Sequence, residues 1–547
     1  MKTKKTPIKY LLLLSVIGTV LFQTSCTKDF EKYNTNRYNA TDSLLKIDGE
    51  GLGTFMVPMQ LSIFSTTNYL YQLQQNLNAD IYSGYMMSGD PFNGGVNNTN
   101  YGLVTGWNTA PFNIGFQNIM SNWLQVSKRA AASSPDYLAI ANILKVEGMH
   151  RVTDVYGPMP YTSFGKGGFT TPYDSQEVIY NTFFTELDFA IKTLTQYTKA
   201  NPGAKPFQPY DLVYNGDYKQ WLKFANSLKL RLAIRIAMVN PTLAKTKAEE
   251  AVNDPNGLFT TNSDNAFVHA VNGVTFTNSL WSITYEYEDI NMGAPMECYL
   301  KGYNDPRLPF YFVPNSQGQY RGIRNGVQIT STQQYADASL LYFGDPNATR
   351  KVFVNTKPST PIQLMAASEI SFLRAEGALR GWNMGGTSSN FYNQGIALSF
   401  DLNGVSGSLG NYANDATSTE APYTDLASAT NNVPAGSPYL SKITIKWDEG
   451  ATYQQKLERI ITQKWLGLWP DGEEAWAEFR RTNYPVLMPV VVNNSQGTIS
   501  TTDFIRRIPF SKDEYDNNKA EVTKAASLLN GPDNGGTRLW WDLKVKN

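Results

Sequence analysis

Apolar side chains recur at helical spacing in several long segments of the chain. After residue 174, four apolar residues follow one another at spacings of four, four and three, which aligns them on one face of a helix; they are Phe183, Leu187, Ile191 and Leu194. Similar patterns predict helices over the ranges 136–155, 217–239, 366–382, 390–400, 455–469 and 473–481.

Start and stop residues mark the ends of several of these helices. Gly157 and Pro158 follow the 136–155 pattern and end it. Asp174, with Glu177 three residues later, has the spacing of a capping box, which predicts that Asp174 caps the next helix. The pair Asn240-Pro241 ends the 217–239 helix and begins another, because proline suits the first helical turn.

The order of these elements predicts a mainly α fold. Helix pairs joined by short turns, with alanines facing larger side chains, indicate hairpins similar to tetratricopeptide repeats, although no strict 34-residue repeat occurs. A few short strands or turns are expected at 267–290 and 311–329. Three loop-rich insertions, around 84–113, 267–330 and 403–438, are long enough to be functional or disordered. We therefore expect the helical hairpins to form the scaffold and the insertions to carry any ligand site.

The first 26 residues have the pattern of an export signal. Lysines at the start precede an apolar run of 13 residues, 10–22, which is too short to span a bilayer. The run ends at Thr24-Ser25-Cys26, which resembles the lipobox of bacterial lipoproteins, although Gln23 stands where leucine is common. We expect 1–25 to be a lipoprotein signal peptide, Cys26 the lipidated residue, 26–50 a polar tether and 51–547 a single domain. The alternative is an ordinary signal cut elsewhere, with Cys26 incidental.

Charge and cysteine content exclude several classes of protein. The chain has 47 basic and 47 acidic residues, and removing the four lysines of the signal leaves 43 against 47, or about −4. No basic stripe for nucleic acid is present. Charged residues are only 17% of the chain, whereas aromatic residues are 13%, so the surface is expected to rely on neutral polar groups and rings. With two cysteines, Cys26 and Cys298, a disulfide framework is impossible, and a single bridge between them is the alternative to lipidation.

Residues for catalysis or metal binding are scarce. The only histidines, His150 and His269, do not form a zinc cluster with the two cysteines, and no cofactor-binding motif occurs, so neither metal nor cofactor is predicted. Calcium at Asp/Asn-rich loops such as 253–257 stays open. Glu474 and Glu478 lie on one helical face, and paired carboxylates serve glycoside hydrolysis. Acidic residues in the first turn of this helix and basic residues in its last turn also suit the helix dipole. A structural role for the two glutamates is therefore the preferred interpretation.

The aromatic, asparagine-rich loops are the better candidates for function. An aromatic face stacks on the C–H face of a sugar, and amide side chains both donate to and accept from hydroxyls. Tyr101 and Trp107 in the first insertion, and Trp281, Tyr285 and Tyr287 in the second, are therefore the candidate ligand-binding residues. For each ring taken alone, burial in an ordinary core is the alternative.

Several motifs spread over the chain are similar to those of one known family. The segment 153–161 is similar to a D-x-Y-G-D-x-P-Y turn, with Pro158 where an acidic residue is commoner. The most specific block is WLKFANSLKLRLA at 221–233. Further matching blocks are 173–180, 369–382, 463–465, 474–482, 506–509 and 540–542. On these residues the chain resembles the SusD/RagB family of nutrient-binding outer-membrane lipoproteins of Bacteroidetes.

The resemblance implies a non-enzymatic protein on the outer membrane, lipid-anchored and facing the cell exterior. It also implies a SusC-like TonB-dependent transporter as partner, to which the protein passes an oligosaccharide. A peptide-binding relative with the same partner is the alternative within this class. A surface-anchored glycoside hydrolase using Glu474, and a purely structural helical scaffold, are the alternatives outside it.

Overall fold

The computed structural model describes residues 50–130, 133–344 and 359–543. The predicted signal peptide, Cys26 and nearly all of the tether lie outside these residues. Contacts group Leu52–Asn547 into one unit, which is the part considered below. No helix among the described residues is both long and apolar enough to cross a membrane.

Long helices form the framework of this unit. They are α3 (Glu50–Ile63), α7 (Ser121–Ala130), α8 (Pro135–Tyr156), α9 (Gln176–Ala200), α10 (Tyr218–Arg235), α11 (Pro241–Asn253), α15 (Ala367–Leu379), α16 (Ser388–Leu402), α18 (Tyr453–Leu468) and α19 (Gly472–Thr482). Shorter helices are α4 (Asn68–Tyr71), α5 (Ala79–Tyr82), α6 (Ala110–Ile114), α12 (Ser279–Tyr285), α13 (Ala294–Gly302), α14 (Leu308–Tyr311), α17 (Leu409–Ala413), α20 (Lys512–Asn517) and α21 (Lys519–Ala526).

Three antiparallel pairs of very short strands complete the described secondary structure. They are β1 (Met86–Met87) with β3 (Asn291–Met292), β2 (Ala266–Val268) with β6 (Ile362–Met365), and β4 (Phe312–Val313) with β5 (Leu340–Leu341). Each pair joins segments far apart in the sequence. β1 and β3 thus join the first insertion to the second, and β2 with β6 joins the start of the second insertion to the segment before α15.

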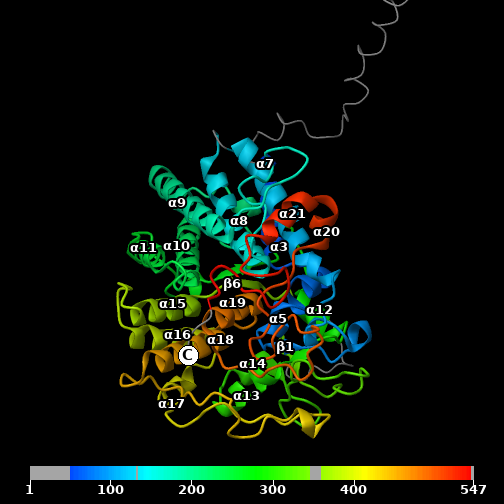
Figure 1. Cartoon of the computed structure of the whole chain (residues 1–547). Coiled ribbons are helices and arrows are strands. Elements are labelled where there is room, and N and C mark those ends of the chain that lie inside the picture. Colours follow the sequence, from blue (N-terminus) through cyan, green and yellow to red (C-terminus); the bar gives the residue numbers. More distant parts are fainter. Residues whose placement is uncertain (1–49, 131–132, 345–358, 544–547) are drawn as a thin grey trace, which may run out of the picture. The chain divides into compact units, whose positions relative to one another are not determined.

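The helices pack as hairpins in sequence order. Helix α8 packs on α9, α10 on α11, and α15 on α16, while α9 also contacts α10, and α18 contacts both α15 and α16. Figure 1 shows α9, α10, α15, α16 and α18 following one another through the domain. Small residues allow close approach: a Cβ added at Gly395 of α16 would lie 2.6 Å from the Phe372 ring of α15. The predicted mainly α fold of helical hairpins is confirmed.

Most predicted helix ends agree with the structure, and one predicted cap is wrong. Asn240 accepts from the Leu243 amide at the start of α11, as expected, but α10 ends at Arg235, four residues before the predicted end at 239. Ser175, not Asp174, caps α9, since its hydroxyl accepts from the Val178 amide. The Asp174 carboxylate instead accepts from the amides of Tyr161 and Thr162, at 3.2 and 2.6 Å, and so closes the preceding loop. This tertiary role is not visible in the local spacing.

The predicted strands at 267–290 and the open loop at 84–113 also require correction. Residues 279–285 form α12, because the Asn278 side chain accepts from the Leu280 amide and starts a helix there. The 84–113 segment contains β1, three short 3₁₀ turns and the start of α6. The 403–438 segment likewise contains α17 and two 3₁₀ turns. These insertions are thus folded parts of the domain.

A network of buried charges joins five helices. Arg231 of α10 contacts Glu147 of α8 at 3.3 Å and Glu369 of α15 at 2.7 Å. Arg235 of α10 contacts Glu474 and Glu478 of α19 at 2.5 and 2.7 Å. The remaining members, all from the same helices or the residue before α19, are Arg151, Asp154, Glu376, Lys464, Asp471 and Arg481. We call this set the buried ion network.

Replacing Arg235 by methionine should destabilise the fold strongly. Arg235 is fully buried and pairs with Glu474 and Glu478. Without it, these two buried carboxylates lose a positive partner, and solvent cannot reach them to compensate. Breaking a buried pair in this way costs about 3–5 kcal/mol. Urea denaturation should show this loss in the free energy of unfolding. The matched control is Lys512→Ala, which breaks an exposed pair with Asp516 and should change stability by less than about 1 kcal/mol. Similar values for the two variants would contradict the role given to the network.

Candidate functional site

A pocket of about 430 Å³ lies where α12, β6 and the connection between α18 and α19 meet. Its lining comes from segments spread over most of the sequence, including Phe64 after α3, Phe267 of β2, Phe343 after β5 and Trp469 after α18. The volume is in the range of small-molecule sites, about 300–1,000 Å³. We call it the aromatic pocket.

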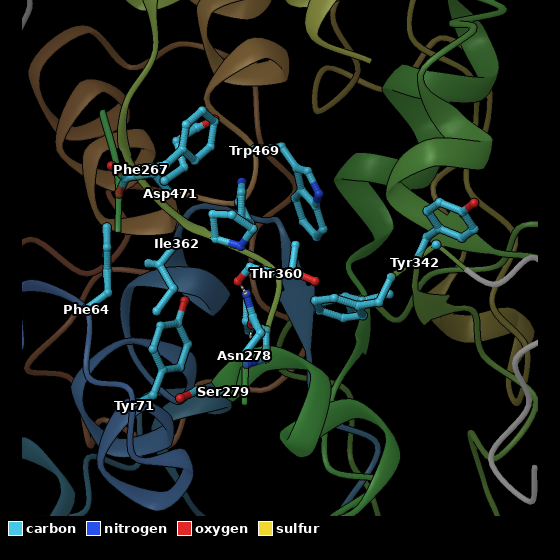
Figure 2. Close-up of a pocket in the computed structure, with 17 residues that line it drawn as sticks. Phe64, Tyr71, Phe267, Asn278, Ser279, Tyr342, Thr360, Ile362, Trp469 and Asp471 are labelled. Atoms are coloured by element: carbon cyan, nitrogen blue, oxygen red, sulfur yellow. Dashed lines mark hydrogen bonds between the residues drawn. The ribbon is translucent and has the colours of Figure 1, made fainter. Parts of the chain in front are cut away.

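Trp469 forms a fixed wall of the aromatic pocket. Its indole stacks on the Tyr311 ring at 5.5 Å and contacts the rings of Phe312 and Tyr85 at 4.7 and 5.4 Å. These neighbours hold one side of the indole, while the residue also lines the pocket. Figure 2 shows Trp469 and Phe267 at one end and Tyr71 with Ser279 at the other, whereas the Tyr342 ring points away from the rest. The pocket therefore presents a rigid aromatic surface.

Polar side chains of the aromatic pocket are largely used within the fold. The Asn278 amide donates to the Thr360 carbonyl at 3.2 Å, and its oxygen caps α12. The Gln363 amide donates to the Leu468 carbonyl at 3.4 Å, and the Ser279 hydroxyl to the Ser65 carbonyl at 2.9 Å. Contacts with a ligand would thus come chiefly from rings and apolar groups.

Beneath the pocket lies a cluster of acidic groups. The Tyr71 hydroxyl donates to Asp80 at 3.5 Å, and Asp80 is near both Asp471 and Glu473. Burial, together with these neighbouring carboxylates, raises the pKa of Asp80 to about 8. Burial likewise raises the pKa of Glu473 to about 7, against the favourable field of Arg151. Asp471 itself is paired with Arg151 at 2.9 Å. Burial thus favours the protonated form of both Asp80 and Glu473.

The predicted residues of the second insertion lie behind the pocket wall rather than in it. Trp281 and Tyr285 are 2% and 3% exposed and pack with Val313 and Leu340, against which Tyr342 and Phe343 also pack. The Tyr285 hydroxyl donates to the Leu341 carbonyl at 2.6 Å. Tyr287 is 40% exposed and does not line the pocket. Trp281 and Tyr285 are therefore core residues, which is the alternative that the sequence analysis left open for each ring.

The predicted residues of the first insertion lie elsewhere. Tyr101 is buried with its ring 6.4 Å from Tyr82, and the half-buried Trp107 contacts Phe92 edge to face at 5.7 Å. Neither lines the aromatic pocket.

Asparagine amides of this first insertion also serve the fold. The Asn98 amide donates to the side-chain oxygens of Asn78 and Asn108, at 2.6 and 2.9 Å. Asn97 and Asn100 form the reciprocal cap of a 3₁₀ turn. Much of the neutral polar character that suggested ligand binding in this insertion is therefore structural.

The carboxylates considered for catalysis belong to the buried ion network. Glu474 and Glu478 are each 2% exposed, and the pKa of both is lowered because Arg235, Lys464 and other cations offset their burial. Neither can supply a neutral acid at pH 7, as glycoside hydrolysis requires. His150 is also buried, and its pKa is lowered by burial. Among the described residues, no group of three or more His, Cys, Asp or Glu side chains is arranged to hold a metal ion.

Sequence analysis missed the rings that line the aromatic pocket. Trp469 was assigned to the end of a helix, but α18 ends at Leu468, and Trp469-Pro470 forms the turn into α19. The proline after the tryptophan was the available signal, because a residue before proline is disfavoured in helices. Phe64, Phe267 and Phe343 have no local signal that separates them from core residues.

The comparisons with known proteins agree on one family. A family model described as SusD-like, Susd and RagB outer membrane lipoprotein, matches residues 32–542. The chain belongs to the SusD-like family. The resemblance found in its motifs is therefore confirmed. Trp221, Arg231 and Arg480 of those motifs are fully buried, which agrees with a role in the scaffold.

Solved SusD homologues share the fold over almost their whole length. One is a chitin-binding SusD homologue from Flavobacterium johnsoniae, 42% identical with a TM-score of 0.84, covering 90% of this chain and 99% of that chain. A SusD homologue from Bacteroides uniformis is 38% identical with a TM-score of 0.82 over 90% and 99%. A SusD-like protein from Bacteroides thetaiotaomicron is 35% identical with a TM-score of 0.82 over 90% and 99%. No curated protein gave a significant match.

The acidic cluster beneath the pocket predicts an unusual pH dependence of stability. Asp80 keeps its proton in the folded state up to about pH 8, whereas in the unfolded chain it loses the proton near pH 4. The folded state therefore binds more protons between these values, and stability falls as pH rises through this range. In Asp80→Asn, the free energy of unfolding should fall less steeply with pH, by up to about 1.4 kcal/mol per pH unit.

Denaturation of the Asp80→Asn variant at pH 5, 6, 7 and 8 measures the effect. The exposed Asp448→Asn serves as control and should keep the wild-type slope. An Asp80→Asn slope equal to that of wild type would show that Asp80 is ionised in the folded protein.

Proposed function

We propose that this SusD-like protein captures oligosaccharides at the cell surface and that the aromatic pocket is a glycan-binding site. The proposal rests chiefly on the 42% identity with a chitin-binding SusD homologue over 90% of the chain. The pocket supports it, because Trp469 and Phe343 offer flat apolar surfaces of the kind on which sugar C–H faces stack. Glycans of N-acetylglucosamine are the first class to test.

The anchor and the transporter complete the proposed role. Cys26 carries the lipid that holds the protein at the outer membrane, with the body facing the cell exterior. A SusC-like TonB-dependent transporter receives the bound glycan. The protein itself binds without turnover, and the ion pairing of Glu474 and Glu478 supports this against the hydrolase alternative.

A peptide ligand is the second candidate. The observation that favours it is the use of pocket polar groups within the fold, which leaves a mainly apolar pocket also suited to an apolar side chain. A sugar needs a flat ring to stack on, whereas a peptide side chain needs only apolar volume. The two ligands therefore differ in what they require of Phe343.

Phe343→Leu should separate these ligands. The substitution keeps apolar bulk against Tyr285 but removes the flat ring. Loss of one stacking contact, about 1.5 kcal/mol, lowers glycan affinity about tenfold. Calorimetric titration with chito-, cello-, malto- and xylo-oligosaccharides and with a mixed peptide library measures both ligand classes.

The control for this experiment is Tyr439→Ala, which removes a 38% exposed ring that does not line the pocket. Its glycan affinity and melting temperature should match those of wild type. Unchanged glycan affinity in Phe343→Leu would show that glycans do not bind in the aromatic pocket. Binding of peptides but of no glycan would instead favour the second candidate.

Cys26→Ala should release the protein from the membrane. Stable attachment takes two or more lipid signals, each buried CH₂ contributing about 0.8 kcal/mol, and the variant lacks the residue that would carry them. Fractionation of cells should find the wild type in the outer membrane and the variant in soluble fractions. A variant that stays with membranes after a high-salt wash would contradict lipidation at Cys26.

A further inference from the structure

A second cleft lies between α16, α17 and the segment 446–449. It has a volume of about 420 Å³ and shares no lining residue with the aromatic pocket. In Figure 1, α17 and α12 lie on opposite sides of the view, which places the two sites apart on the domain. The cleft residues used below are Ser389, Asn393, Asn414, Lys446, Trp447 and Glu449. We call it the α16–α17 cleft.

Trp447 is the one large aromatic ring of this cleft lining. Its indole is half-buried and packs on the ring of Tyr392 at 5.2 Å, while the Lys456 ammonium lies 5.9 Å from its centre. Tyr392 is fully buried, and its hydroxyl donates to the Ile445 carbonyl at 2.5 Å. The Trp447 ring is therefore held in place from the protein side.

The indole N–H of Trp447 is shielded from solvent and has no hydrogen-bond acceptor within the described part of the chain. Tryptophan N–H groups usually find a partner when buried. Because this N–H has almost no exposed surface, the part of Trp447 that a ligand in the cleft can reach is its ring and not its N–H.

Polar groups around Trp447 are also unused, in contrast to those of the aromatic pocket. Across the described residues, the side chains of Ser389, Asn393 and Lys446 make no hydrogen bond or ion pair. The Asn414 amide donates to the Gly410 carbonyl at 2.8 Å, which leaves its side-chain oxygen unused. The cleft thus combines a fixed ring with donors and acceptors that the fold does not need.

We propose that the α16–α17 cleft is a second carbohydrate subsite, in which Trp447 stacks on a neutral pyranose ring and Asn393, Asn414 and Lys446 bind its hydroxyls. The volume suits such a ligand. Glu449 is already paired with Lys456 at 3.2 Å, which leaves the Lys446 ammonium as a donor to sugar hydroxyls. The inference takes its ligand class from the proposed function but rests on different residues.

Two separate subsites on one protein would favour long glycans. Once one site holds a chain, the other binds from a high effective concentration, so avidity exceeds either affinity. Full-length protein in detergent should therefore bind two equivalents of N-acetylchitohexaose and retain long polymer more strongly than the hexamer.

Variants of each site test this arrangement. Trp447→Ala should reduce the stoichiometry for the hexamer from two to one, whereas Trp447→Phe, which keeps a ring on Tyr392, should retain two. Asn393→Ala should weaken the second site about fivefold. Because Asn393 is exposed and its side chain has no partner among the described residues, this variant folds normally even where Trp447→Ala does not.

The outcomes separate this inference from the proposed function. Loss of one equivalent in Trp447→Ala, together with about tenfold weaker binding at one of the two sites in Phe343→Leu, supports both. Glycan binding that depends on Phe343 but is unchanged in Trp447→Ala and Asn393→Ala overturns the second subsite and leaves the proposed function intact. A wild-type protein that binds none of the oligosaccharides overturns both.

Discussion

The buried ion network is the constraint on which the rest of the domain depends. Arg231 and Arg235 of α10 reach carboxylates on α8, α15 and α19, so a shift of any of these helices would separate a buried charge from its partner. Apolar contacts change little in free energy when helices shift slightly, whereas a buried charge that loses its partner is strongly destabilising. The network therefore opposes shifts between the hairpins, and the apolar faces of α8, α10 and α15 pack around it.

The same network positions the aromatic pocket. Asp471 pairs with Arg151 and also accepts from the Glu474 amide, so it both joins the network and caps α19. Trp469 precedes it by two residues and is held by Tyr311 and Phe312 on the other side. The turn that carries the pocket tryptophan is thus fixed at one end by charge and at the other by ring packing. A site built in this way is rigid before any ligand arrives, which lowers the entropic cost of binding.

Sequence alone predicted the scaffold better than the site, for a physical reason. Helical periodicity reports a buried face directly, so α8 and α19 were found to within one residue of each end. Ligand contact has no such period. Asn98 in a loop looks the same whether its amide binds a sugar or, as observed, Asn78. The sequence around Trp281 does not reveal that its ring is buried. Trp469 was predicted as the last residue of a helix, but the helix ends at Leu468. Only the tertiary partners separate these cases.

Burial of charge also explains how the surface comes to suit a neutral ligand. The sequence has few charged residues, and the network and its neighbours place many of those inside, including Arg307, Arg481 and Arg507. At the α16–α17 cleft, amides, a hydroxyl and a half-buried ring lie beside only two charged residues, Lys446 and Glu449. Many of the charged side chains therefore stabilise the packing of the helices. Ligand recognition at the cleft would rely mainly on shape, ring stacking and hydrogen bonds to neutral groups. Contacts of these kinds depend little on salt, in contrast to the attraction between a basic surface and a polyanion.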